Sequence, residues 1–179
     1  LFDDKRKFNI KNFSAKADSL LEKQERLVII LNTPAHNPTG YALSDADWRN
    51  VVNYFSSVSK EKKITLLADI AYIDFAGDEE KYRSFLPIIE EVPENVLVVI
   101  AHSLSKAYTL YGMRCGAMIC MAKTEEIAAE FKRVCEFSAR ASWSNCPRAP
   151  QVILSKIYQD PKLKAKVDEE RKGFRDMLL

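Results

Sequence analysis

The sequence predicts an α/β protein with a largely parallel sheet packed between helices in a three-layer sandwich. Short apolar runs rich in β-branched residues recur along the chain, and helical patterns lie between them. This alternation is typical of parallel α/β domains. In addition, polar residues able to carry chemistry follow three of the apolar runs directly. Open α/β sheets bind ligands outside the carboxyl ends of their strands, so the pattern predicts a site at one sheet edge.

Four segments have the composition of buried strands, because each is a continuous apolar run bounded by polar or turn-forming residues. They are residues 27–32, 64–69, 95–101 and 116–121. Asn37 follows the first run, Asp69 and Tyr72 the second, and Ser103 and Lys106 the third. These residues are therefore expected to meet at the carboxyl edge of the sheet.

Helices are predicted between the strands and after them. Ser44 is a good N-cap for a helix over residues 44–59, with acidic residues in its first turn. The apolar face of that helix holds Trp48, Val51, Val52 and Phe55. Further helices are expected over the segments 82–91, 124 to about 141, 151–159 and 161 to the end, with a break over 142–150.

Length and composition place the chain among ordinary globular proteins. Its 179 residues are enough for one core, and a net charge of +2 with interspersed acids and bases favours neither nucleic acid nor an acidic membrane as a partner. The apolar runs are shorter than a membrane span. Cys115, Cys120, Cys135 and Cys146 lack metal-finger spacing and are expected to be buried free thiols in a reducing, cytoplasmic compartment. No metal site is predicted.

Lys106 lies in the segment Ser-Leu-Ser-Lys-Ala-Tyr-Thr-Leu-Tyr-Gly-Met-Arg-Cys-Gly, which covers residues 103–116. Asn37 in Asn-Pro-Thr-Gly and the pair Asp69 and Tyr72 stand upstream in a fitting order. Together these motifs resemble the cofactor site of the class I pyridoxal-phosphate aminotransferases of the aspartate aminotransferase type. The resemblance runs from Asn37 to about Asn145.

The resemblance implies pyridoxal 5′-phosphate as cofactor and gives each residue a role. Lys106 would hold the cofactor aldehyde as an imine, the internal aldimine, and then move a proton during catalysis. Asp69 would keep the pyridine nitrogen protonated. Tyr72 and Asn37 would donate hydrogen bonds to the phenolate oxygen, and Asn37 would also contact substrate. Read without the resemblance, Asp69 is a turn or cap residue and Asn37 part of an ordinary turn.

The phosphate of the cofactor would be held by Arg114, with Ser103 and Ser105 adding hydroxyl donors. Gly112 and Gly116 would allow a tight backbone path around it. Arg140 resembles the arginine that, in this family, reaches the partner subunit's site and binds the distal carboxylate of dicarboxylic substrates. It is otherwise a surface arginine at a helix end. His36 and His102 are expected to be structural.

The resulting prediction is an aminotransferase that moves an amino group from an amino acid, aspartate or another acidic or aromatic one, to 2-oxoglutarate. It would act as a homodimer with shared active sites. A β- or γ-lyase of the same fold and a pyridoxal-phosphate-sensing domain of a transcriptional regulator stay open as alternatives. Residues 1–160 are predicted to be the later part of the cofactor-binding large domain. Residues 161–179 would begin the long helix towards a small domain, in a piece of a longer protein.

Overall fold

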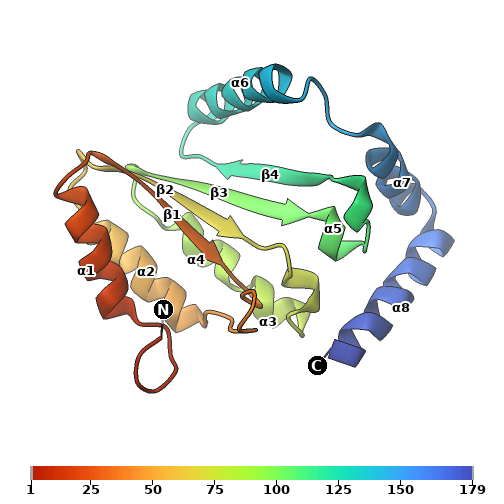
Figure 1. Cartoon of the computed structure of the whole chain (residues 1–179), viewed down its shortest axis with the longest axis horizontal. Helices are drawn as coiled ribbons and strands as arrows, with labels where there is room; N and C mark the ends of the chain where they lie inside the picture. The colour runs from red at the N-terminus through yellow and green to blue at the C-terminus, as the bar shows by residue number, and fades with distance from the viewer. Residues whose placement is uncertain (1, 179) are drawn as a thin grey trace.

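The computed structural model describes residues 2–178. Its centre is one four-stranded sheet with the strand order β1-β2-β3-β4 (Figure 1). The strands are β1 (Arg26–Asn32), β2 (Lys63–Asp69), β3 (Val96–Ser103) and β4 (Gly116–Met121). The first three are parallel and β4 runs antiparallel to β3. The four predicted strands and the α/β class with a largely parallel sheet are thus confirmed.

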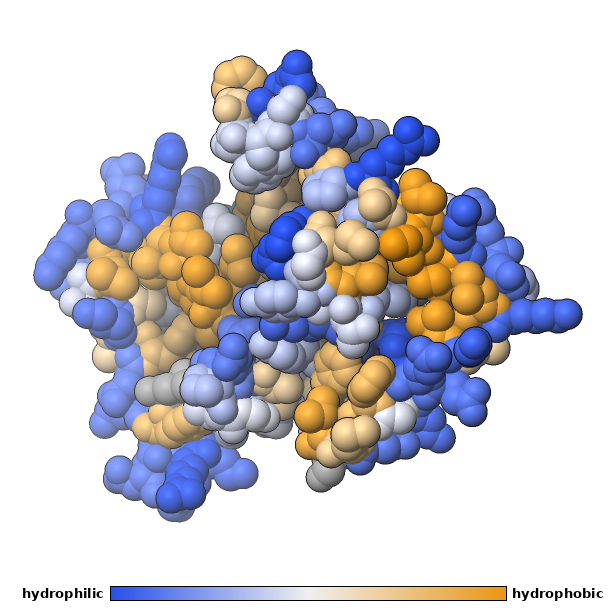
Figure 2. All heavy atoms as spheres, turned by 45° about the vertical axis from the view of Figure 1, so that its right-hand side comes forward, coloured by the Kyte–Doolittle hydropathy of each residue, from blue (hydrophilic) through white to orange (hydrophobic). Residues whose placement is uncertain are grey.

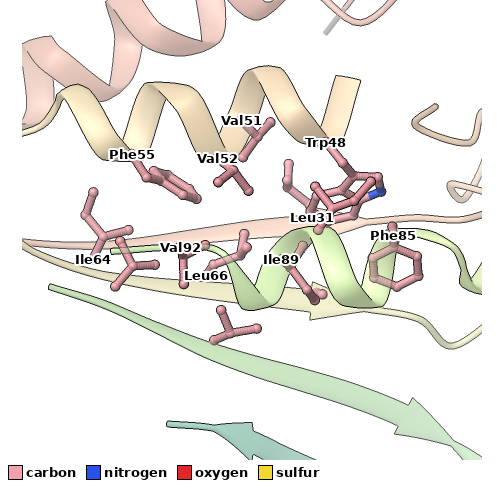
Figure 3. Close-up of a cluster of buried hydrophobic side chains, with 14 of the residues drawn as sticks. Leu31, Trp48, Val51, Val52, Phe55, Ile64, Leu66, Phe85, Ile89 and Val92 are labelled. Carbon is pink, nitrogen blue, oxygen red and sulfur yellow. The ribbon is translucent and has the colours of Figure 1, made fainter. Parts of the chain in front are cut away.

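Helices α1 (Ile10–Leu21), α2 (Asp45–Ser57) and α4 (Phe85–Glu90) cover one face of the sheet (Figure 1). The main core lies between them and the strands, as Figure 3 shows. The predicted apolar face of α2 is buried there, and its Trp48 stacks on Phe85 with ring centres 5.0 Å apart. Leu31 and Leu66 bring the sheet into the same cluster.

The N-terminus of α2 begins as predicted. The Ser44 hydroxyl accepts a hydrogen bond from the Asp47 amide at 3.2 Å, and the Asp47 carboxylate accepts one from the Ser44 amide at 2.9 Å. This reciprocal capping box satisfies two amide groups that the helix itself leaves unpaired. Thr124 caps helix α6 (Glu125–Ser142) in the simpler way, accepting from the Ile127 amide.

The single helix expected over residues 82–91 is wrong in its extent. The structure has two short helices, α3 (Glu79–Arg83) and α4, which meet at Ser84. The Ser84 hydroxyl donates to the Lys81 carbonyl at 2.7 Å and also lies 2.7 Å from the Asp45 carboxylate of α2. Pro87, in the first turn of α4, lacks the N–H that a continuous helix would donate to the Arg83 carbonyl, so the hydrogen-bond ladder is interrupted between α3 and α4. Helix α1, capped by Asn9, was not predicted.

The C-terminal third is helical, as predicted. Beyond α6 come α7 (Arg148–Gln159) and α8 (Pro161–Leu178), which run past the end of β3 where the four-residue helix α5 (Leu104–Ala107) lies (Figure 1). On the sheet face away from α1 and α2, Val28 and Ile30 are 62% and 64% exposed. Figure 2 shows hydrophobic side chains gathered in several surface patches. None of the helices within residues 2–178 is long and apolar enough to span a membrane.

Candidate functional site

The carboxyl ends of the three parallel strands bring the predicted residues to one edge of the sheet. Asn32 at the end of β1 pairs in register with Asp69 at the end of β2, and Asp69 pairs with Ala101 in β3. Ser103 ends β3, and Lys106 follows within α5. The sheet therefore places Asp69 and the Lys106 segment on adjacent strands, as the sequence pattern predicts.

Asn32, which the sequence analysis did not single out, organises this edge. Its side-chain oxygen accepts a hydrogen bond from the Asn37 amide at 2.7 Å, and its side-chain nitrogen donates to the Asp69 carbonyl at 3.3 Å. The side-chain nitrogen of Asn37 in turn lies 3.5 Å from the Tyr72 hydroxyl. The Asn37 amide and the Tyr72 phenol thus form one polar pair. Its position at the end of a strand is the sequence signal that could have identified Asn32 as a site residue.

The Lys106 amine lies among aromatic rings beside that pair. Its Nζ atom is 5.2 Å from the centre of the Tyr72 ring and 4.5 Å from the centre of the Tyr111 ring. An ammonium over an aromatic face is attracted by the ring quadrupole. The side chain is half-buried, and it is held in the site by both rings. Tyr111 belongs to the same motif as Lys106 but was not assigned a role from the sequence.

One oxygen of the Asp69 carboxylate is hydrogen-bonded within the turn, and the other is not. Its Oδ1 atom accepts a hydrogen bond from the Ala71 amide at 3.1 Å, as the turn interpretation requires. Its Oδ2 atom receives no hydrogen bond from the part of the chain that the structure describes. The turn fixes the carboxylate and leaves this second oxygen able to accept from a ligand N–H.

Arg114 contacts one of the two serines predicted to bind the phosphate with it. Its Nη1 atom donates to the Ser105 hydroxyl at 3.3 Å and to the Tyr111 carbonyl at 2.8 Å. The guanidinium carbon lies 5.3 Å from the Tyr111 ring centre. Arg114 itself has a left-handed backbone, with φ of +51°. Ser103 is the last residue of β3, and among the described residues its hydroxyl makes no hydrogen bond to Arg114.

The two glycines of this segment differ. A Cβ atom at Gly116 would lie 2.5 Å from the His102 carbonyl oxygen of β3, whereas one at Gly112 would meet nothing within 4 Å. A close backbone approach therefore requires glycine at position 116 only. The tight backbone path expected at Gly112 is not supported by any such contact. Gly116 pairs with Ser103 in the β3–β4 ladder. The glycine lets β4 pack against the strand that leads into the lysine turn.

Arg140 is not brought to this group of residues. It is exposed in the last turn of α6 and hydrogen-bonds the Ser144 hydroxyl. The two histidines have polar contacts of their own. His36 Nδ1 lies 2.8 Å from the Thr39 hydroxyl, and His102 Nε2 lies 3.7 Å from the Asp74 carboxylate.

Asp74, in the short turn Ile73–Phe75 that follows Tyr72, has a carboxylate only 10% exposed and was not predicted from the sequence. Burial alone would raise the pKa of its carboxyl, but the His102 contact and the charges of Arg171 and Arg83 outweigh burial and lower that pKa. Because these partners are far away in the sequence, no local pattern marks Asp74.

The cysteines are free thiols, but their burial was overestimated. Cys115, Cys120 and Cys135 are half-buried and Cys146 is exposed. Burial raises the pKa of the Cys120 thiol. Within residues 2–178 no three His, Cys, Asp or Glu side chains are grouped to hold a metal.

The donor set fits an aromatic aldehyde that carries a phosphate. An amine (Lys106), a carboxylate oxygen (Asp69), a phenol–amide pair (Tyr72 and Asn37) and an arginine with serines border one sheet edge. These are the groups needed to bind, in order, an aldehyde, a ring N–H, a phenolate oxygen and a phosphate.

Comparison with known proteins places this site in a family context. Residues 3–178 match the family model described as aminotransferase class I and II. The aromatic-amino-acid aminotransferase of Pseudomonas aeruginosa is 32% identical over 166 residues, covering 90% of this chain and 40% of that protein. This chain thus spans about two-fifths of the length of that curated relative.

Two solved structures resemble the chain closely. An aminotransferase from Anaerococcus prevotii superposes with a TM-score of 0.93 at 37% identity, covering 98% of this chain and 43% of that one. The aromatic-amino-acid aminotransferase of Burkholderia pseudomallei, covalently bound to pyridoxal phosphate, gives a TM-score of 0.76 at 26% identity, covering 96% and 42%.

Proposed function

Because the chain belongs to the class I and II aminotransferases, we propose that it forms part of the cofactor-binding domain of a pyridoxal-phosphate-dependent aminotransferase. The observation that carries the proposal is the convergence of Lys106, Tyr72, Asn37 and Asp69 at the carboxyl edge of the parallel sheet. The covalently bound cofactor of the Burkholderia pseudomallei relative supports the choice of pyridoxal phosphate.

The cofactor, when bound, supplies an aldehyde for the amino group and a ring that accepts electrons. Each residue then has a task set by its chemistry. The Lys106 amine would hold the cofactor through its aldehyde carbon and, when free, would carry a proton to or from the substrate Cα. The free Asp69 oxygen accepts from the ring N–H and keeps it protonated. The positions of both groups at strand ends support these roles.

The remaining residues hold the cofactor in place. Tyr72 and Asn37, already within 3.5 Å of each other, donate to the phenolate oxygen. Arg114, with Ser105 and Ser103, binds the phosphate, since a guanidinium and hydroxyls suit phosphate oxygens. Asn37 is exposed on its loop and is therefore also able to contact substrate.

For the substrate, we propose an acidic or aromatic amino donor and 2-oxoglutarate as acceptor. The names of the two aromatic-amino-acid aminotransferases support an aromatic donor. Arg140 supports an acidic one, because it resembles the arginine that binds the distal carboxylate of dicarboxylic substrates in this family, and it is exposed at the end of α6. The shared-site homodimer, the small domain beyond α8 and a cytoplasmic location stay predictions.

The test is the visible absorption spectrum of the full-length protein reconstituted with pyridoxal phosphate. We expect a band of lysine-bound cofactor that disappears in Lys106→Ala and persists in Lys63→Ala, a control at the opposite end of β2. Adding L-aspartate or L-phenylalanine should convert the band to the amino form of the cofactor, and 2-oxoglutarate should restore it.

The outcomes separate the possibilities. A Lys106-dependent band that neither amino acid converts would contradict transamination of these donors and favour a lyase or a sensor of the cofactor. A spectrum identical in Lys106→Ala and Lys63→Ala would contradict the cofactor site itself.

A further inference from the structure

We propose that Arg171, in α8, is a positioning residue that fixes the turn carrying Lys106 and ties it to the loop carrying Tyr72. This inference rests on the proposed function, because it concerns how the amine of that site is held. Helix α8 has no fully buried residue, yet the Arg171 side chain is only 19% exposed.

The first contact is with the lysine turn itself. The Arg171 Nε atom donates a hydrogen bond to the Ala107 carbonyl at 2.7 Å. Ala107 is the last residue of α5, so its carbonyl is one of those that a helix end leaves unpaired. A helix of four residues has little stability of its own and depends on tertiary contacts. Arg171 supplies such a contact one residue after Lys106.

The second contact extends along the same turn. The guanidinium carbon of Arg171 lies 4.5 Å from the centre of the Tyr108 ring. The Tyr108 hydroxyl is 2.8 Å from the Tyr158 hydroxyl of α7. Burial, together with the Tyr158 hydrogen bond, raises the pKa of Tyr108, so the phenol stays neutral. Tyr108 is thus held between two helices.

The third contact joins the turn to the loop after β2. The Arg171 Nη2 atom lies 3.1 Å from the buried carboxylate of Asp74, two residues after Tyr72 in the sequence. Asp74 also binds Arg83 at 3.0 Å and faces His102 in β3. One guanidinium therefore contacts both segments whose side chains, Lys106 and Tyr72, face each other in the site.

Helix α8 offers a matched control in Arg175, one turn further along. Its side chain is 21% exposed, close to the value for Arg171, and it pairs with Glu79 at 3.6 Å. Within the described residues it makes no hydrogen bond or ion pair with residues 104–108 or with Asp74. Losing Arg175 removes a similar charge from the same helix and leaves the lysine turn untouched.

The first measurement is amide hydrogen exchange of the cofactor-free, full-length protein, followed in peptides covering residues 104–113. In Arg171→Ala we expect exchange there to be on the order of tenfold faster, since the loss of a hydrogen bond from a charged group favours local opening. Arg175→Ala should match the wild type. Exchange in Arg171→Lys should also be faster than in the wild type, because one ammonium cannot reproduce the forked contacts to Ala107 and Asp74.

The second measurement is circular dichroism in the visible band of the reconstituted protein, relative to its absorbance. This ratio reports how firmly the lysine-bound cofactor is oriented. It should fall in Arg171→Ala and Arg171→Lys and stay at the wild-type value in Arg175→Ala.

Equal exchange and equal dichroism in Arg171→Ala and Arg175→Ala would overturn the positioning role. That result would leave the proposed function intact as long as the wild type shows its Lys106-dependent band. Absence of that band would instead contradict the proposed function, and the exchange measurement, made without cofactor, would still decide the role of Arg171 in ordering the turn.

Discussion

Gly116 gives the sharpest test of how the sheet positions the lysine segment. Its missing Cβ would sit 2.5 Å from the backbone carbonyl oxygen of His102. In favourable C–H···O contacts the carbon lies about 3.3–3.6 Å from the oxygen. In Gly116→Ala, β3 and β4 must therefore move apart by roughly 1 Å, or the carbonyl must turn out of the ladder. Neither partner atom belongs to a flexible side chain, so the strain has no easy release.

We expect Gly116→Ala to lower the free energy of unfolding by about 1–3 kcal/mol, the range found for overpacking, because the added Cβ would lie against the β3 backbone. The shift occurs at the Ser103–Gly116 pair, directly before α5. Binding of pyridoxal phosphate should weaken as well. Gly112→Ala is the matched control, because a Cβ there meets nothing within 4 Å.

The assay is urea denaturation of the full-length protein without cofactor, followed by titration with pyridoxal phosphate. Gly112→Ala should unfold within about 0.5 kcal/mol of the wild type, as is usual for surface substitutions. If Gly116→Ala is as stable as Gly112→Ala and binds the cofactor equally well, the close approach of β4 to β3 does not constrain the site, and the reasoning is refuted.

Three further predictions concern the core, the buried carboxylate and the substrate. Trp48→Ala should lower the free energy of unfolding by about 3–5 kcal/mol, because Trp48 is 1% exposed, whereas Trp143→Ala, at a 63% exposed position, should lower it little. Similar losses in both variants would contradict the core described above. Because the Asp74 pKa is lowered on folding, its charged form stabilises the fold fully above the ordinary carboxyl pKa, and this is lost as pH falls through the lowered value. The stability difference between wild type and Asp74→Asn in urea titrations should therefore be largest near neutrality and shrink below about pH 4, and a pH-independent difference would count against the charge. Arg140→Ala should raise KM for aspartate on the order of tenfold without changing KM for an aromatic donor, while Arg133→Ala, exposed on the same helix, should change neither KM. Equal effects of Arg140→Ala on both donors would argue against its binding the distal carboxylate of the substrate.

Elements whose signals are local could be predicted from the residues alone. Each apolar run became a strand, because a continuous β-branched segment satisfies a buried strand without help from distant residues. Ser44 and Thr124 cap helices through contacts only three residues long. The positions of Asn37, Asp69 and Lys106 just after strands followed from the same runs, so their convergence at one edge was predictable.

Only the tertiary structure decided what depends on residues far apart in the chain. The antiparallel direction of β4 follows from its pairing with β3, which no periodicity within residues 116–121 encodes. The hydrogen bond of Ser84 to Asp45 joins two separate helices and depends on the fold. The ion pair between Asp74 and Arg171 could not be predicted from the sequence, because the two residues are brought together only by folding and no local pattern marks them. The sequence thus specified the reactive groups, whereas the packing of α8 against the lysine turn specified how they are held.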